Sequence, residues 1–588
     1  MTVYDYAVVV IYFIFISSFG LVFRKFSKDS SDFFRGGGNV LWWLVGATAF
    51  MSQFSAWTFT GAASKAYTDG TLIMVLFLGN ALGFLLAGLW FGARFRQMRV
   101  VTPMEAIRDR FGKHSEQFFT WVWLPIGIFY AAIWLYSVSV FISVVFQWNI
   151  IMTIVIVGFV VLFEASLGGS WAVVAVDFMQ CLVLMPISII MAFLAIQAVG
   201  DGSFLSGAAQ FVDKLPANHL DWDAILRPKI VYLWIIAVLI KQFCTINNLN
   251  DSNRFLFSKD SKNASRAGML AAILFAVGPV VWFIPPMAAA ILYPDLKVIP
   301  ELGGLENVTE GAYVGMGLRY LPMGMVGLMV SAIFAATMSS MDTGLNKNAG
   351  IFVRNFYKPI LRKHASEKEY VIVGKTISVI FGCLIILGAI GIDMFGDVGL
   401  FNVMMQFSAA VAIPFVIPLI WGMFIKRTPS WAGWSTVLVG FAASYLSSQY
   451  LDTNIIQKLL GLDTPITPRE KPDAVFIASL LGNIIVPSLW FIGTSFFARY
   501  NKQEYTAQEE EFFQRMSTPL ITKPEDTKAM DKAQLRTLAK LCIPYGTFIM
   551  LLCVIPNGIT GRLCFIFAGG VIAGIGVLLL WRSKKITM

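Results

Sequence analysis

The sequence predicts an all-α integral membrane protein with about 15 transmembrane helices, on the basis of its composition and the length of its apolar segments. Hydrophobic residues make up 57% of the 588 positions and charged residues only 14%, whereas soluble domains are roughly 25% charged. A helix needs about 20 apolar residues to cross a hydrocarbon core about 30 Å thick. Segments of that length recur along the whole chain.

Polar loops separate the expected helices. Their approximate spans are 5–23, 41–66, 72–95, 117–146, 150–166, 170–200, 229–247, 265–293, 313–345, 369–391, 397–425, 430–448, 473–497, 537–555 and 560–582. The first segment has no basic leading region and is followed by Arg24 and Lys25 rather than by a small-residue cleavage site. We therefore expect a retained helix and not a signal peptide.

Basic and acidic loops alternate along the chain. Lysine and arginine concentrate in stretches 94–113, 254–266, 347–368, 426–427 and 582–585, which alternate with the acidic loops 201–228 and 294–312. The positive-inside rule predicts that the basic loops are cytoplasmic, with the N-terminus outside and the C-terminus inside. The expected location is the plasma membrane, which is the inner membrane in a Gram-negative bacterium.

Composition argues against several classes of function. The six cysteines show no paired spacing and the three histidines fall in expected loops, so neither a disulfide framework nor a zinc site is indicated. The chain carries no nucleophile motif, no HExxH and no cofactor fingerprint, so we do not expect an enzyme. The formal charge of +10 is explained by the basic loops, so it does not indicate a nucleic-acid partner.

A cluster of side-chain oxygens interrupts an apolar segment near its end. Ser339, Ser340, Asp342 and Thr343 lie within little more than one helical turn. Polar atoms inside a membrane need partners, and oxygen ligands suit a hard cation such as Na⁺. The cluster predicts a cation site.

Segment 41–66 contains a second irregularity. Polar residues between Ser52 and Thr60 interrupt the hydrophobic run just before Gly61. A broken helix would free backbone carbonyls at membrane depth, which is tolerated where they are buried in protein or bind an ion. The alternative is a continuous helix whose hydroxyls bond to their own backbone.

The chain resembles the sodium:solute symporter family, which includes sodium/glucose and sodium/proline transporters. The motifs that carry the resemblance are Thr102-Pro103-Met104-Glu105-Ala106 with Arg110-Phe111-Gly112, Gly168-Gly169-Ser170 with Asp177 and Gln180, Asn253-Arg254 with Ser258-Lys259-Asp260, and the stretch from Ala335 to Asn346. Their order and spacing extend the resemblance over roughly residues 5–500.

The resemblance implies a LeuT-type core of two inverted five-helix repeats that alternates access around a midplane site. The implied divisions are an extra N-terminal helix at 5–23, the two repeats at 41–200 and 229–425, two additional helices at 430–497, a cytoplasmic linker at 498–536 and a C-terminal helix pair at 537–582. We expect the linker to be solvated, with a short amphipathic helix around 509–516.

The resemblance also implies the ligands of a main Na⁺ site. They are the carbonyl oxygens of Met51, Phe54 and Ala336 and the hydroxyls of Ser339 and Ser340. Five oxygens suit Na⁺.

A second ion site is implied by the pattern of some family members. Asp177, Ser339, Asp342 and Thr343 match its positions, although Asp342 stands where a serine or threonine is usual. Three interpretations stay open: two coupled Na⁺ ions, one Na⁺ with a protonatable carboxylate, or a structural pairing of Asp342 with Lys347.

Positions that contact sugar in relatives correspond here to Thr58, Asn80, Asn248 and Gln406, and to Leu78 and Phe275, which replace the glutamate and lysine of the sugar pattern. These two replacements lower the expectation of a hexose. Trp57 is expected to form an apolar wall or to pack against neighbouring helices. Lys241 either meets a substrate carboxylate or a buried aspartate, or extends to the membrane interface.

The expected function is sodium-coupled symport of a small polar organic solute, with Na⁺, the solute and the lipid bilayer as partners. The alternatives are a proton-coupled or passive carrier of the same fold, and a sensor that binds solute without moving it.

Overall fold

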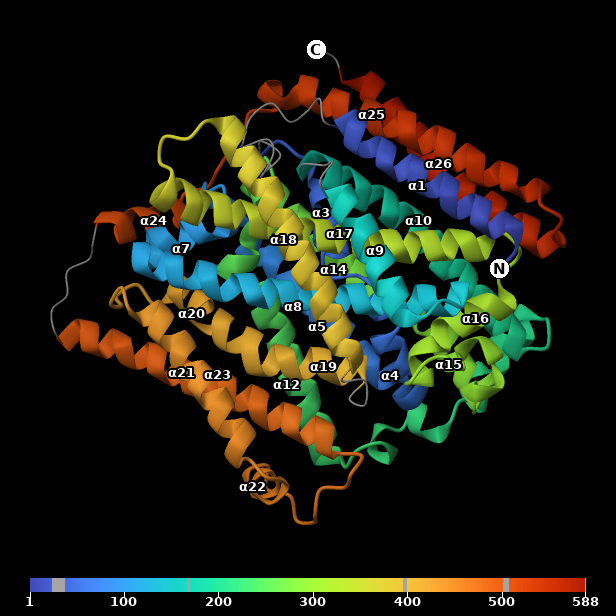
Figure 1. Cartoon of the computed structure of the whole chain (residues 1–588), viewed down its shortest axis with the longest axis horizontal. Coiled ribbons are helices and arrows are strands. Elements are labelled where there is room, and N and C mark those ends of the chain that lie inside the picture. Colours follow the sequence, from blue (N-terminus) through green and yellow to red (C-terminus); the bar gives the residue numbers. More distant parts are fainter. Residues whose placement is uncertain (24–37, 166–169, 395–398, 501–506, 587–588) are drawn as a thin grey trace.

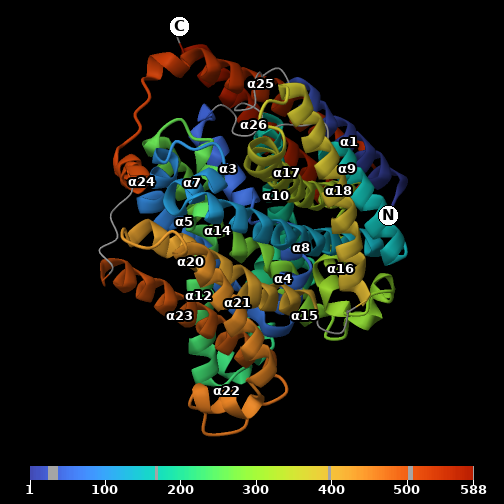
Figure 2. The same ribbon diagram turned by 60° about the vertical axis from the view of Figure 1, so that its left-hand side comes forward.

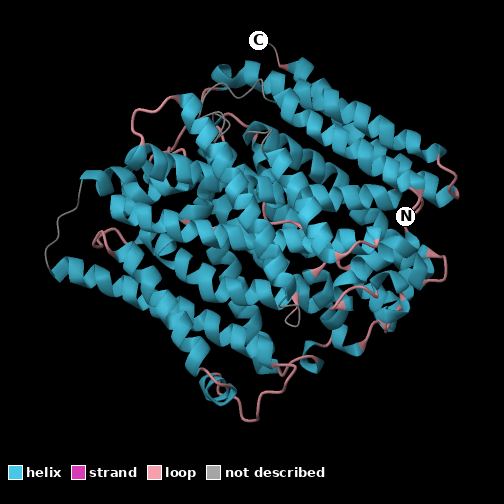
Figure 3. Ribbon diagram, in the orientation of Figure 1, coloured by secondary structure: helices cyan, strands magenta, loops and turns pink. Residues whose placement is uncertain are grey.

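A computed structural model describes residues 1–23, 38–165, 170–394, 399–500 and 507–586. Within these ranges the secondary structure is helical, with an isolated bridge between Val40 and Ser258 and no strand (Figure 3). The expected all-α architecture is confirmed. Eleven of the described helices are long and apolar enough to cross a membrane, so the count of about fifteen is not confirmed.

The first half of the chain begins with a long helix and continues into the broken one. Its helices are α1 (Val3–Phe23), α3 (Trp42–Met51), α4 (Gly61–Asp69), α5 (Met74–Leu86), α6 (Gly92–Gln97), α7 (Pro103–Phe111), α8 (Lys113–Phe146), α9 (Ile150–Ala165), α10 (Ser170–Val199) and α11 (Phe204–Lys214).

The second half holds the remaining helices. They are α12 (Pro228–Ile246), α13 (Asn253–Leu256), α14 (Ser261–Trp282), α15 (Ile284–Leu292), α16 (Ala312–Tyr320), α17 (Met325–Ile351), α18 (Glu367–Met394), α19 (Leu400–Phe407), α20 (Ile413–Phe424), α21 (Ala432–Tyr450), α22 (Thr453–Leu459), α23 (Lys471–Tyr500), α24 (Ala507–Ser517), α25 (Pro524–Leu551) and α26 (Ile559–Lys585).

Two segments that were each expected to form one helix form two helices in the structure. The segment expected at 313–345 divides into α16 and α17, because Pro322 disfavours a helical conformation in the residue before it and Gly324 adopts a positive φ of 87°. The segment expected at 265–293 divides at Phe283, where Pro285 and Pro286 begin α15.

The basic loops gather at one end of the bundle, which we call the basic end. The Arg110 guanidinium donates to the carbonyls of Gly422 and Ile425 at 2.8 and 2.7 Å, and Arg354 lies 3.4 Å from Glu105. α7 and α24 lie at this end, on the left in Figure 1. α15 and α16 lie at the opposite end, on the right, which we call the acidic end (Figures 1 and 2).

α17 runs through the middle of the bundle and packs against α1, α8 and α10 (Figure 2). In the most apolar stretch of the span from Met325 to Leu361, 94% of the residues are buried. Its N-terminus is capped from the first helix of the chain, where the carboxylate of Asp5 accepts from the N–H groups of Gly324 and Gly327 at 2.8 and 3.0 Å. A carboxylate at a helix N-terminus satisfies free N–H groups and complements the helix dipole.

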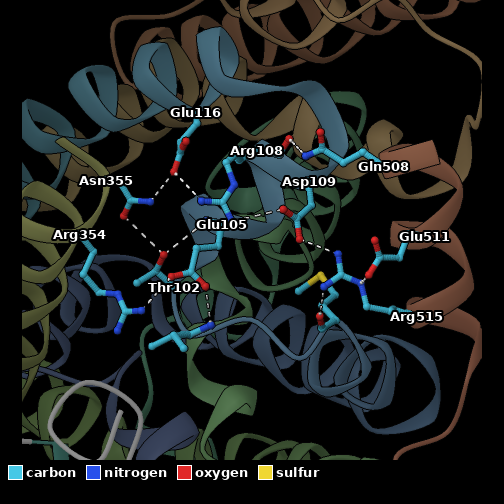
Figure 4. A network of polar contacts seen from close by, with 12 residues as sticks. Thr102, Glu105, Arg108, Asp109, Glu116, Arg354, Asn355, Gln508, Glu511 and Arg515 are labelled. Carbon is cyan, nitrogen blue, oxygen red and sulfur yellow. Dashed lines mark hydrogen bonds and ion pairs between the residues drawn. The ribbon is translucent and has the colours of Figure 1, made fainter. Parts of the chain in front are cut away.

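The expected linker is bound to the bundle instead of lying in solvent. We call residues 507–534 the strap. Its helix α24 buries Phe512 and Met516, and Arg515 lies 2.6 Å from Asp109 of α7. Gln508 donates to the carbonyl of Arg108 at 3.0 Å (Figure 4).

The strap then crosses to other helices of the basic end. The N–H of Leu520 donates to the Ser261 hydroxyl at 2.9 Å, and Asp531 pairs with Lys259. Gln534 donates to the carbonyl of Asn39 at 2.9 Å, just before α3. The strap therefore joins α7 to the starts of α14 and α3.

Replacing Arg515 with alanine should loosen the strap. Losing a charge-assisted hydrogen bond costs about 1.5–3 kcal/mol, so we expect proteinase K to cut within residues 507–523 roughly tenfold faster than in the wild type. The control is Glu510→Gln, an exposed position on the same helix, which should leave the cleavage rate unchanged. Equal cleavage of wild type and Arg515→Ala would contradict the docking.

Candidate functional site

The helical segment expected at 41–66 is broken in its middle. α3 ends at Met51, and the chain resumes as a short helical turn η3 (Ala56–Thr58) before α4 begins at Gly61. The hydroxyl of Ser55 accepts from the N–H of Trp57 at 3.3 Å, so a side chain takes the place of a helical carbonyl. The continuous-helix alternative does not hold.

α17 supplies partners to the broken segment. The Thr337 hydroxyl accepts from the N–H of Ala56 at 2.8 Å and donates to the carbonyl of Ile333 in its own helix. The break and α17 are therefore joined by backbone-to-side-chain contacts between residues almost three hundred positions apart.

The Ser340 hydroxyl lies among the three carbonyls expected at the main ion site. Its oxygen is 3.4 Å from the carbonyl oxygen of Met51, 3.0 Å from that of Phe54 and 3.3 Å from that of Ala336. A hydroxyl has one proton to donate, yet three acceptors converge on it. A convergence of oxygens without nitrogen or sulfur fits Na⁺.

Ser339 turns away from this group. Its hydroxyl donates to the carboxylate of Asp177 on α10. Asp177 is only 1% exposed. The structure therefore brings together Ser339 and Asp177 of the expected second site. Asp342 lies farther along α17 and is half-buried, and the side chain of Thr343 falls outside the described residues.

The residue expected as the alternative partner of Asp342 faces another carboxylate. The Lys347 ammonium lies 3.9 Å from Asp251 and donates to the carbonyl of Asn250 at 3.0 Å.

A cavity of about 200 Å³ adjoins the Ser340 site. Three of the six expected solute contacts line it, namely Trp57, Asn80 and Lys241. The cavity extends to Asp251 and Arg254, towards the basic end.

The other three expected solute contacts lie away from this lining. Thr58 is buried within η3. Asn248 uses its side chain to end α12, because its Oδ1 accepts from the N–H groups of Asn250 and Asp251 and its Nδ2 donates to the carbonyl of Cys244. Gln406 is exposed on α19.

Aromatic packing closes the cavity on the side of the acidic end. The Trp57 ring stacks on Phe401 with a centroid distance of 5.8 Å, and its N–H donates to the carbonyl of Leu400 at 3.5 Å. Glu310, which is 5% exposed, accepts from the N–H of Leu400 at 2.8 Å and so holds the start of α19. Beyond this closure lies an outer cavity of about 530 Å³.

Ion pairs brace the same closure. Lys65 on α4 lies 2.7 Å from Asp69 and 3.7 Å from Asp473 on α23, and Arg469 pairs with both carboxylates.

Sequence reasoning missed Thr337, Glu310 and Arg469. Each has a partner far away in the chain. Glu310 and Arg469 lie outside the motifs named above, whereas Thr337 lies in the stretch from Ala335 to Asn346 but was not singled out.

The chain is similar to known sodium-coupled transporters. The model of the sodium:solute symporter family matches residues 33–440. The sodium/glucose cotransporter of Vibrio parahaemolyticus is 26% identical over 436 aligned residues, covering 71% of this chain and 78% of the relative. The sodium/sialic acid symporter of Aliivibrio fischeri is 24% identical over 437, covering 73% and 84%.

The fold is shared with a solved structure. A substrate-bound, outward-open Na⁺-coupled sialic acid symporter superposes with a TM-score of 0.62 at 21% identity, covering 83% of this chain and 98% of that one.

The Glu310 contact predicts a pH-dependent stability. Burial raises the pKa of Glu310, against the opposing effect of its hydrogen bonds from Leu400 and Asn307. A raised pKa in the folded protein means that the stabilisation by the protonated form is lost as the pH rises through that value. Glu310→Gln keeps an oxygen acceptor for Leu400 without the charge. We expect a higher melting temperature than wild type at pH 8 and a gain that shrinks towards pH 5.

The matched control is Glu306→Gln, an exposed position that lines the same outer cavity; it should show no gain at either pH. A lower melting temperature of Glu310→Gln at pH 8 would mean that the charge itself stabilises the closure.

Proposed function

Because the chain belongs to the sodium:solute symporter family, we propose that it is a secondary active symporter that uses Na⁺ to import a small polar organic solute. It is a multi-pass membrane protein and not an enzyme. The observation that carries the proposal is the convergence of the Met51, Phe54 and Ala336 carbonyls on the Ser340 hydroxyl. The relatives, which carry glucose, myo-inositol and sialic acid, support a polar organic solute.

In the proposed mechanism, Na⁺ binds where the broken helix meets α17. Two of its ligands come from the break and two from α17, so the ion ties the two elements together and stabilises the geometry in which the solute cavity is complete. When Na⁺ leaves to the cytoplasm, the contact between the broken helix and α17 weakens. A ligand shifts such an equilibrium only by its difference in affinity for the two states.

The sodium gradient supplies enough energy for accumulation. One charge moving through 100 mV yields about 2.3 kcal/mol, and a tenfold concentration ratio adds about 1.4 kcal/mol. Together they support a solute accumulation of roughly several hundredfold for one ion.

The proposed core consists of inverted repeats at 41–200 and 229–425, with the basic end cytoplasmic, the N-terminus outside and the protein in the plasma membrane. The opposite placement of the termini supports an odd number of crossings, since Asp5 contacts the start of α17 at the acidic end and Ile586 contacts Lys532 at the basic end. The described conformation is inward-facing in this orientation, because the Trp57–Phe401 stack closes the outer side.

A second ion is proposed at Asp177 and Ser339, with Asp342 and Thr343 as further ligands. A buried carboxylate that receives a hydroxyl hydrogen bond is a suitable ligand for a second Na⁺ or a suitable carrier for a proton. This contact is also what favours the alternative of proton coupling.

Replacing Ser340 with alanine should weaken Na⁺ binding roughly tenfold or more, because one oxygen ligand and its charge-dipole interaction are lost. The measurement is the rise in melting temperature of the purified protein as Na⁺ replaces K⁺. Ser331→Ala on the same helix is the control, since that hydroxyl bonds to the carbonyl of Gly327 in its own helix. An unchanged Na⁺ response in Ser340→Ala would refute the main site.

Replacing Asp177 with asparagine separates the two forms of the second-ion proposal. If the second ion is Na⁺, the Hill coefficient of the Na⁺ titration should fall towards one at both pH 6 and pH 8. If it is a proton, the difference between the titrations at the two pH values should disappear. A variant that changes neither quantity would leave Asp177 without a role in ion coupling.

A further inference from the structure

Lys241 places a positive charge inside the solute cavity. It lies on α12, is 6% exposed and lines the cavity. Its ammonium donates to Oε1 of Gln242 at 3.1 Å, so the side chain stays in the bundle and does not extend to an interface. Among the described residues, no carboxylate lies within ion-pair distance of it.

A buried ammonium without a carboxylate is costly. The penalty for removing an ion from water amounts to several kcal/mol even after the protein relaxes, and ionisable groups in membrane-spanning segments are retained where they pair or act on a substrate. A neutral amide offers only partial compensation.

The other charges of the cavity do not offset it. Of the described residues that line the cavity, Lys241, Arg254 and Lys347 are cationic and Asp251 is the carboxylate. Arg254 and Lys347 both face Asp251, at 3.4 and 3.9 Å. Na⁺ at Ser340 would add a further positive charge to the same space. The cavity therefore attracts an anion.

The amides beside Lys241 are oriented by its charge. An ammonium has only donors, so Gln242 turns its Oε1 towards Lys241 and its Nε2 towards Oδ1 of Asn80. Asn80 thereby uses its oxygen and keeps its amide N–H groups as the donors available to a ligand in the cavity. An ammonium and an N–H donor on neighbouring helices suit the two oxygens of a carboxylate.

We propose that the transported solute is a small organic carboxylate whose charged group binds Lys241 and Asn80. This inference rests on the proposed function and specifies its substrate class. A volume of about 200 Å³ lies below the roughly 300–1,000 Å³ of typical ligand pockets, so the solute is one ring or a short chain. The rings of Trp57, Phe77 and Trp134 line the same cavity and receive its apolar part.

The first test needs no solute. Lys241→Gln removes the charge but keeps an amide donor near Gln242. If the Lys241 ammonium is paired only when the solute is bound, the solute-free variant should melt several degrees higher than the solute-free wild type. The reason is that the variant no longer buries an unpaired charge. The control is Lys229→Gln, an exposed lysine on the same helix that donates to the carbonyl of Gly461; it should not gain stability. A lower melting temperature of Lys241→Gln than of Lys229→Gln would overturn the proposal in favour of a structural role.

The second test uses matched pairs of small solutes that differ in a carboxylate. The pairs are D-glucuronate and D-glucose, nicotinate and nicotinamide, and lactate and propane-1,2-diol, each in Na⁺ and in K⁺. We expect at least one carboxylate to stabilise the wild type in Na⁺ while its neutral counterpart does not. The half-saturating concentration should rise roughly 10- to 100-fold in Lys241→Gln, and less in Lys241→Arg.

The outcomes separate the two proposals. Stabilisation by neutral solutes in Na⁺, with none by carboxylates, overturns the carboxylate inference and leaves sodium symport intact. No stabilisation by any carboxylate, or an unchanged response in Lys241→Gln, also overturns the inference. A carboxylate that stabilises equally in Na⁺ and K⁺ supports the inference and overturns sodium coupling.

Discussion

The break in the helix between Met51 and Ala56 is the constraint on which the rest of the site depends. Inside a membrane, backbone groups released from a helix must find partners within the protein, and α17 provides them through Thr337 and Ser340. This requires α17 to be held at a fixed depth, which the Asp5 cap on its first turn helps to secure. The first helix of the chain thus contributes to the geometry of the proposed ion site through α17.

Charge is distributed differently around the outer cavity and the inner cavity. On the acidic side, Lys65, Arg469, Asp69 and Asp473 satisfy one another, so their contacts must break before the path opens there. In the cavity, Lys241 lacks such a partner among the described residues. Ion pairing therefore stabilises the closed acidic side, whereas the unpaired ammonium of Lys241 is what makes the cavity suitable for the proposed anionic solute.

The polar contacts of Ser339 and Ser340 could be anticipated from the sequence because their hydroxyls stand out in an apolar run. The break could be predicted because polar residues interrupt segment 41–66. Asn248 shows the limit of positional matching: a residue can occupy the expected place while its side chain ends a helix instead of facing a ligand. The strap was missed because its composition is polar, although Phe512 and Met516 share one helical face. Asp5 and Glu310 act on helices far along the chain, which no local pattern reveals.

The strap holds the basic end together through ion pairs whose strength depends on ionic strength. It joins α7 to the starts of α14 and α3 through pairs such as Arg515 with Asp109 and Lys259 with Asp531, each with at least one partly exposed member. Charges near water are screened over about 10 Å at 0.1 M salt. A rearrangement that separates these helices must break these pairs, and its energy barrier therefore falls as the salt concentration beside the basic end rises. This effect of salt is separate from the binding of Na⁺ at the proposed site.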